Sequence, residues 1–166
     1  EIDRALLKGE IDFAVHSAKD LPDKIAEGLH IAAITSPIDS YDALVSKNNL
    51  KLNQLARGAK IGSSSLRRKT QLKEYRNDFN LVDIRGNIQE RLNIMDKTDL
   101  DAVIIAACAL LRLGLEHRIA QRLPFEILKP HPLQGSLAIA VRREDGESAV
   151  LFSKLDIRRN ELLVSS

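Results

Sequence analysis

The sequence has 166 residues, 44% of them apolar and 29% charged, which suits one domain or two small ones and excludes a disordered or fibrous chain. Lys and Arg number 25 against 23 Asp and Glu, and this net charge of +2 excludes a strong overall field for holding nucleic acid or an anionic membrane. A single cysteine excludes an internal disulfide, and no apolar run approaches the length of a membrane span.

Short runs rich in Ile, Val, Leu and Ala alternate with stretches of helical periodicity, a pattern typical of βαβ units and a largely parallel sheet. We expect strands at residues 11–16, 29–34, 42–45, 60–62, 80–84, 101–106 and 136–141. We expect helices at residues 65–75, 87–95, 108–113, 116–123 and 147–155. The predicted fold class is therefore α/β.

Two segments rich in turn-forming residues, TSPIDSY at 35–41 and KPHPLQG at 129–135, interrupt this alternation. We interpret residues 36–40 and 130–135 as paired hinge segments. The sequence then predicts one nearly complete domain at 41–129, whereas the flanks 1–35 and 136–157 form part of another.

Four polar residues gather where the first predicted strand ends, in the sequence HSAKD at 16–20. The carboxyl end of a strand is where ligands bind in open α/β sheets. Taken alone, the stretch also fits a solvated surface turn, because charged loop residues are usually exposed.

A more specific signal lies at 60–75, where a strand runs into GSSS and a helix begins with Arg67, Arg68 and Lys69. Backbone N–H groups at a helix start and serine hydroxyls can form an anion cradle. A cation in the first turn of a helix interacts unfavourably with the helix dipole, by about 0.3–1 kcal/mol. Three such cations therefore indicate a bound anion that compensates them. The alternative is that the arginines point to water and Ser64 or Ser65 only caps the helix.

The same design recurs along the chain. Arg85 follows the next strand, Arg91 lies in the helix after it, and Arg112 follows the strand at 101–106. Successive strands thus bring arginines to one sheet edge, and the forked guanidinium suits carboxylates. The predicted ligand carries several carboxylates or a phosphate chain.

Other chemistries lack their motifs. The sequence contains no glycine motif for dinucleotides or nucleoside triphosphates, no HExxH and no Cys/His cluster, so we expect no metal site. Six aromatic residues are too few for a nucleic-acid stacking platform. Cys108, between Ala107 and Ala109, is interpreted as a packing residue.

In these stretches the sequence resembles the porphobilinogen deaminases, also called hydroxymethylbilane synthases. The strings HSAKDLP, GSSSLRR, RGNIQERL, ALLRLGLEHRI and PLQGSLAI occur in the family's order and spacing. The resemblance implies two type-II periplasmic-binding-protein-like domains joined by a two-strand hinge, with residues 158–166 beginning a third α+β domain that is essentially absent. It also implies a cytoplasmic protein, or an organellar one in a plastid-bearing source, that is monomeric in its full length.

The implied reaction is a transfer in tetrapyrrole biosynthesis. Four porphobilinogen molecules are joined head to tail on a dipyrromethane cofactor, and hydroxymethylbilane and ammonia are released. By position, Asp20 matches the catalytic aspartate, whose carboxylate would accept pyrrole N–H bonds and stabilise the cation formed as ammonia leaves. Cofactor and substrate binding fall on Ser17, Lys19, Ser63, Ser64, Ser65, Arg67, Arg68, Arg85, Gly86, Asn87, Arg91, Arg112, Gln134 and Gly135.

The family attaches its cofactor to a cysteine of the third domain, which is not present in this chain, so we expect the isolated piece to be inactive. The expected partner is porphobilinogen, without nucleic acid or membrane. The alternative is an anion-binding solute receptor of the same two-domain fold, which fold alone cannot separate from an enzyme. Such a receptor binds its anion through hydrogen-bond donors, so the carboxylate of Asp20 would not contribute to binding.

Overall fold

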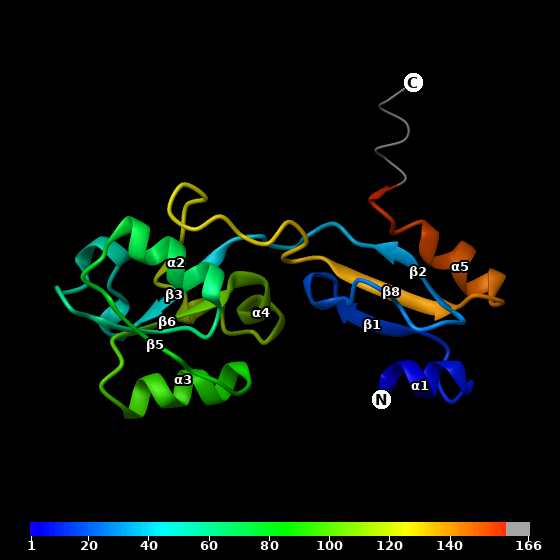
Figure 1. Ribbon diagram of the computed structural model, residues 1–166, viewed down its shortest axis with the longest axis horizontal. Helices are drawn as coiled ribbons and strands as arrows, with labels where there is room; N and C mark the ends of the chain where they lie inside the picture. Colours follow the sequence, from blue (N-terminus) through cyan, green and yellow to red (C-terminus); the bar gives the residue numbers. More distant parts are fainter. Residues whose placement is uncertain (159–166) are drawn as a thin grey trace, which may run out of the picture. The chain divides into compact units, whose positions relative to one another are not determined.

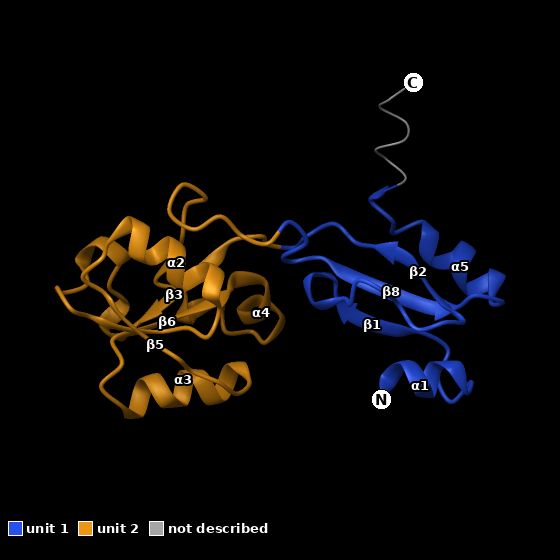
Figure 2. Ribbon diagram, viewed as in Figure 1, with its two compact units in different colours: residues 1–38, 132–166 blue, residues 39–131 orange. Residues whose placement is uncertain are grey.

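The computed structural model describes residues 1–158, and the predicted start of a third domain lies almost wholly outside them. The chain divides into two compact units (Figure 2): unit 1 comprises residues 1–38 and 132–166, and unit 2 comprises residues 39–131. Unit 2 is therefore continuous in sequence, and unit 1 is assembled from both flanks.

Unit 1 is built on a sheet with the strand order β1-β8-β2 (Figure 1). Its strands are β1 (Ala14–Ser17), β2 (Leu29–Ile34) and β8 (Leu137–Arg142), followed by helix α5 (Gly146–Ser153) and preceded by α1 (Ile2–Leu7). Leu6 of α1 packs with Ala14, Leu29 and Ala140 in the small core of this unit. A 3-10 turn, η1 (Ala18–Asp20), directly follows β1.

Unit 2 is built on a sheet with the strand order β5-β4-β6-β3-β7. Its strands are β3 (Asp42–Ser46), β4 (Lys60–Gly62), β5 (Asn80–Val82), β6 (Ala102–Ala106) and β7 (Gln121–Arg122). Its helices are α2 (Leu66–Tyr75), α3 (Ile88–Lys97) and α4 (Ala107–Arg112), with 3-10 turns η2 (Lys47–Asn49), η3 (Leu52–Gln54) and η4 (Glu116–Arg118).

Both faces of the unit 2 sheet are covered by helices. Side chains alternate along β6, so Ile104 joins a core cluster with Leu72 of α2, whereas Ile105 joins a second cluster with Leu92 of α3. All five residues of β6 are buried, which explains its continuous apolar sequence.

The expectation of a largely parallel sheet is wrong. β8 runs antiparallel to both β1 and β2, and β3 runs antiparallel to both β6 and β7, so only β4 pairs in parallel, with β5 and β6. The reason is that β3 and β8 enter their sheets from the other unit. Neither follows a crossover helix, which is the connection that makes neighbouring strands parallel.

The helix expected at 116–123 is also wrong. Only the turn η4 forms there, and the chain then extends as β7 along the edge of β3, where Leu123 N donates to Asp42 O at 2.8 Å and Ala120 N donates to Leu44 O at 2.9 Å. Backbone pairing with a sheet edge outweighs the helical pattern of this short segment. The short helix α1, in which only Leu6 is buried, has no counterpart among the expected elements.

Candidate functional site

Unit 1 presents Asp20 on a fixed turn beyond the end of β1. Buried Ala18 anchors this turn, because its N–H donates to the carbonyl of Ser136 at 3.1 Å. Ser17 and Lys19 are half-buried, Asp20 is exposed, and its carboxylate makes no hydrogen bond or ion pair with another residue in the range 1–158. The turn therefore offers a carboxylate whose acceptor oxygens are open to a ligand.

A cavity of about 140 Å³ adjoins this turn, with Asp20 and His16 in its wall. The Nε2 atom of His16 lies 3.4 Å from Oδ1 of Asp3, which α1 carries into the same cavity. Gln134 and Gly135, at 1% exposure and φ +93° respectively, come just before Ser136 and thus belong to unit 1 with Asp20.

In unit 2, the carboxyl ends of β4, β5 and β6 lie at one edge of the sheet, because these three strands are parallel. The serines after β4 hold that edge together. Ser63 N donates to Val82 O at 2.9 Å, and Ser64 Oγ donates to Ile84 O at 2.5 Å and accepts from Ile84 N at 3.1 Å. Ser65 Oγ caps α2 by accepting from Arg68 N at 3.5 Å. The side chains of Ser64 and Ser65 thus serve the fold.

The anion that compensates the cations of α2 belongs to the protein. Asp42, the first residue of β3, is fully buried and accepts hydrogen bonds from Arg67 Nη2 at 2.6 Å and from Arg68 Nε and Nη2 at 3.1 and 2.6 Å. Cations in the first turn of α2 are therefore not in themselves a sign of a bound anion. Sequence reasoning missed Asp42, whose only signal was an acid at the start of an otherwise apolar strand.

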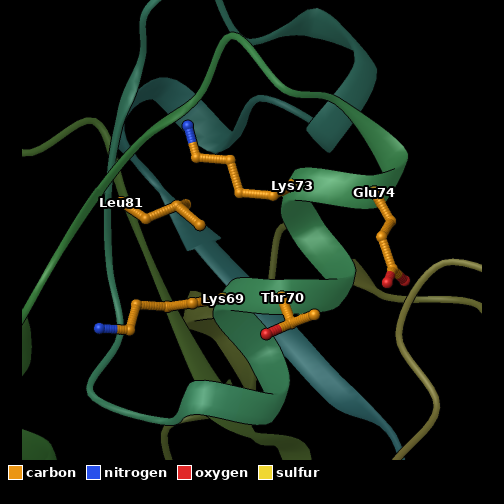
Figure 3. Close-up of a pocket in the computed structure, with 5 residues that line it drawn as sticks. All are labelled: Lys69, Thr70, Lys73, Glu74 and Leu81. Carbon is orange, nitrogen blue, oxygen red and sulfur yellow. The ribbon is translucent and has the colours of Figure 1, made fainter.

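The third cation, Lys69, is also paired. Its ammonium donates to Asp83 Oδ1 at 2.7 Å, and this hydrogen bond and charge hold the pKa of Asp83 below its usual value. Lys69 lines a groove of about 520 Å³ with Lys73 and Leu81, as Figure 3 shows. Lys73 donates to the carbonyls of Asn77 and Phe79, so the ammonium groups of this groove are already bonded within unit 2.

The start of α3 is fixed by a capping box and a glycine. Asn87 Oδ1 accepts from Glu90 N at 2.9 Å, and Asn87 N donates to Glu90 Oε2 at 2.8 Å. Gly86 has φ +104°, and a Cβ there would collide with the Glu90 carboxylate. Arg91 Nε donates back to Gly86 O at 2.7 Å, so the loop that follows β5 is held from both sides.

Arg85 differs from the other predicted arginines. It is exposed in this fixed loop, and its guanidinium makes no hydrogen bond or ion pair within residues 1–158. Arg112, at the exposed end of α4, lies about 1.7 helical turns beyond β6. The structure therefore places Arg67, Arg85, Arg91 and Arg112 after the carboxyl ends of parallel strands, where carboxylate groups of a ligand could be bound.

No group of three His, Cys, Asp or Glu residues suited to a metal ion occurs in the described part of the chain. Within that part there is also no helix long and apolar enough to cross a membrane. Cys108 is a free thiol, 4% exposed, in α4.

Comparisons with known proteins give a consistent family. A family model described as "Porphobilinogen deaminase, dipyromethane cofactor binding domain" matches residues 1–149. A porphobilinogen deaminase of Pelotomaculum thermopropionicum is 45% identical over 99% of this chain and 53% of its own length. One from Natranaerobius thermophilus is 48% identical over 94% of this chain and 50% of its own length. The chain spans about half the length of the curated relatives it matches.

A solved structure titled as an ABC transporter periplasmic substrate-binding protein from Coxiella burnetii superposes with a TM-score of 0.59. It is 19% identical, and the match covers 92% of this chain and 74% of that one. At this identity the likeness shows the fold alone, and it confirms the predicted fold class of type-II periplasmic-binding-protein-like α/β units.

Proposed function

The chain belongs to the porphobilinogen deaminase family, and we propose that the whole protein joins four porphobilinogen molecules head to tail, releasing hydroxymethylbilane and ammonia. The observation that carries this proposal is the family match over residues 1–149, together with about 45% identity to named relatives. The cytoplasmic location and monomeric state expected from the resemblance stay predictions, for which cell fractionation and analytical ultracentrifugation are the tests.

The residues of unit 2 fit the dipyrromethane that the family model names. Such a group carries acetate and propionate side chains, and Arg85 offers an exposed guanidinium whose donors have no partner in the described residues. Arg91 and Arg112 would bind further carboxylates, and Asn87 and Gly86 hold the loop that presents Arg85. When bound, the cofactor supplies the pyrrole end to which the first substrate is joined.

In unit 1, Asp20 is the proposed catalytic residue. Its exposed carboxylate can accept a hydrogen bond from the pyrrole N–H of porphobilinogen and stabilise positive charge as ammonia leaves. It can also take up the proton that must leave the pyrrole to restore aromaticity. Lys19 of the same turn and Ser17, the last residue of β1, would bind substrate carboxylates.

The test replaces Asp20 in the whole protein and uses Asp23→Asn, an exposed acid three residues on, as the matched control. We expect Asp20→Asn to retain bound dipyrromethane, detected with Ehrlich's reagent, and to lose porphobilinogen turnover about 100-fold or more. Asp23→Asn should stay within about twofold of the unaltered protein.

Two results would contradict this reading in different ways. Turnover by Asp20→Asn at the unaltered rate would remove Asp20 from the reaction. An unaltered whole protein that neither carries an Ehrlich-positive group nor consumes porphobilinogen would refute the enzyme and favour the solute receptor.

A further inference from the structure

Asp42 is the most deeply buried charge of unit 2. It stands at the start of β3 with no exposed surface, next to Ala43 and Leu44 of the apolar core. An isolated carboxylate in such a place is strongly disfavoured unless opposite charge and hydrogen bonds compensate it. Both compensating groups come from the first turn of α2, so the position of Asp42 dictates the positions of two guanidinium groups.

The two arginines are held differently. All three nitrogens of the Arg68 guanidinium are bonded within the protein, because Nε and Nη2 bind Asp42 Oδ1 and Nη1 donates to Ile104 O at 3.2 Å. Arg68 is 7% exposed. Three of its five N–H groups are therefore used within the protein, and its burial leaves little surface for a ligand.

Arg67 is bonded through its two terminal nitrogens and leaves Nε open. Its Nη2 binds Asp42 Oδ2, its Nη1 donates to the carbonyl of Lys129, and its side chain is 29% exposed. Nε makes no hydrogen bond with another described residue. The guanidinium thus keeps donors for an incoming carboxylate while Asp42 fixes its plane.

We propose that Asp42 is a positioning residue for carboxylate binding: it holds Arg67 in the orientation that binds the acidic side chains of porphobilinogen and of the growing chain. Arg68, which the family resemblance groups with the binding residues, neutralises Asp42 and touches no ligand. This inference rests on the proposed function for the identity of the ligand, but the arrangement of Asp42, Arg67 and Arg68 does not.

The test is a double-mutant cycle on ligand affinity in the whole protein, with Asp42→Asn and Arg67→Met. Porphobilinogen is the first probe, and its KM and kcat are measured separately. We expect Asp42→Asn to weaken binding about tenfold or more, because a small displacement of a positioned group has large effects. In the Arg67→Met background, the same change should alter binding by less than about twofold.

The matched control is Asp78→Asn, which breaks another aspartate–arginine pair of unit 2, with Arg76 at 2.8 Å. It should lower stability and leave the affinity unchanged. If Asp42→Asn does not fold, the double variant Asp42→Asn/Arg68→Met removes both buried charges and is used in its place, in both backgrounds.

Equal weakening by Asp42→Asn with and without Arg67 would overturn the inference, as would an affinity within about twofold of the unaltered protein. Citrate serves as a second carboxylate probe. If the protein binds citrate but not porphobilinogen, the proposed function is refuted, and the double-mutant cycle is then evaluated from citrate affinities. Binding of neither probe refutes both proposals.

Discussion

Gly86→Ala should weaken unit 2 more than the loss of a typical turn glycine. The residue has φ +104°, where an L side chain is strained by about 1–2 kcal/mol. The added Cβ also meets the Glu90 carboxylate, which must leave the backbone N–H of Asn87. Loss of this capping-box hydrogen bond costs up to the about 0.5–2 kcal/mol of a helix cap, so the expected total is about 1.5–4 kcal/mol.

The measurement is the free energy of unfolding of unit 2 in urea, with circular dichroism as the signal. Gly114→Ala is the matched control, since Gly114 has φ +68° but no atom within 4 Å of an added Cβ, so only the backbone strain applies. The double variant Gly86→Ala/Glu90→Ala should lose less than the sum of its single changes, because the collision is gone. Equal losses for Gly86→Ala and Gly114→Ala, or strict additivity with Glu90→Ala, would refute the reasoning.

Two further predictions concern the turn that precedes β5. The hydrogen bonds from Arg76 lower the pKa of Asp78 from its usual value to about 2, so this pair stabilises the fold above about pH 4 and the contribution disappears as the pH falls toward 2. NMR titration should show this midpoint, and Arg76→Leu should return it to about 4; an unchanged midpoint would exclude Arg76 as the cause. Phe79 is fully buried, and the guanidinium carbon of Arg76 lies 4.2 Å from its ring centroid. Phe79→Ala should lower the free energy of unfolding by about 3–5 kcal/mol. A loss below about 1 kcal/mol in urea unfolding would contradict the core role of Phe79.

The strands and helices that the sequence predicts best are those with clear local boundaries. β2 and β4 have the predicted limits, and Ser65 marks the start of α2, because turn residues and a capping serine stop these elements on both sides. The direction of β3 and β8 was predicted wrongly, because it depends on the unit from which the chain reaches each sheet. Periodicity within a segment carries no such information.

The arginine-rich edge shows a similar division. The alternation of strands and helices predicted that the arginines come after parallel strands, and Arg85 is exposed at such a position in the structure. The partner of Arg67 and Arg68 did not follow, because Asp42 lies more than 20 residues earlier in the chain and reaches them only through the sheet. A cluster of cations in a sequence does not reveal whether its counter-charge is inside the protein or in a ligand.

The central place of β8 in the unit 1 sheet governs the order of folding during synthesis. β1 and β2 are synthesised before β8, and within residues 1–158 both pair only with β8, so that pairing cannot form until residues 137–142 are made. Unit 2 can be completed in the meantime. Joining β2 to β8 closes a loop of about 100 residues, at roughly 4 kcal/mol in an unfolded chain and less once unit 2 has folded. A pause in synthesis after residue 131 would therefore leave the edges of β1 and β2 that later pair with β8 exposed to pairing with other chains.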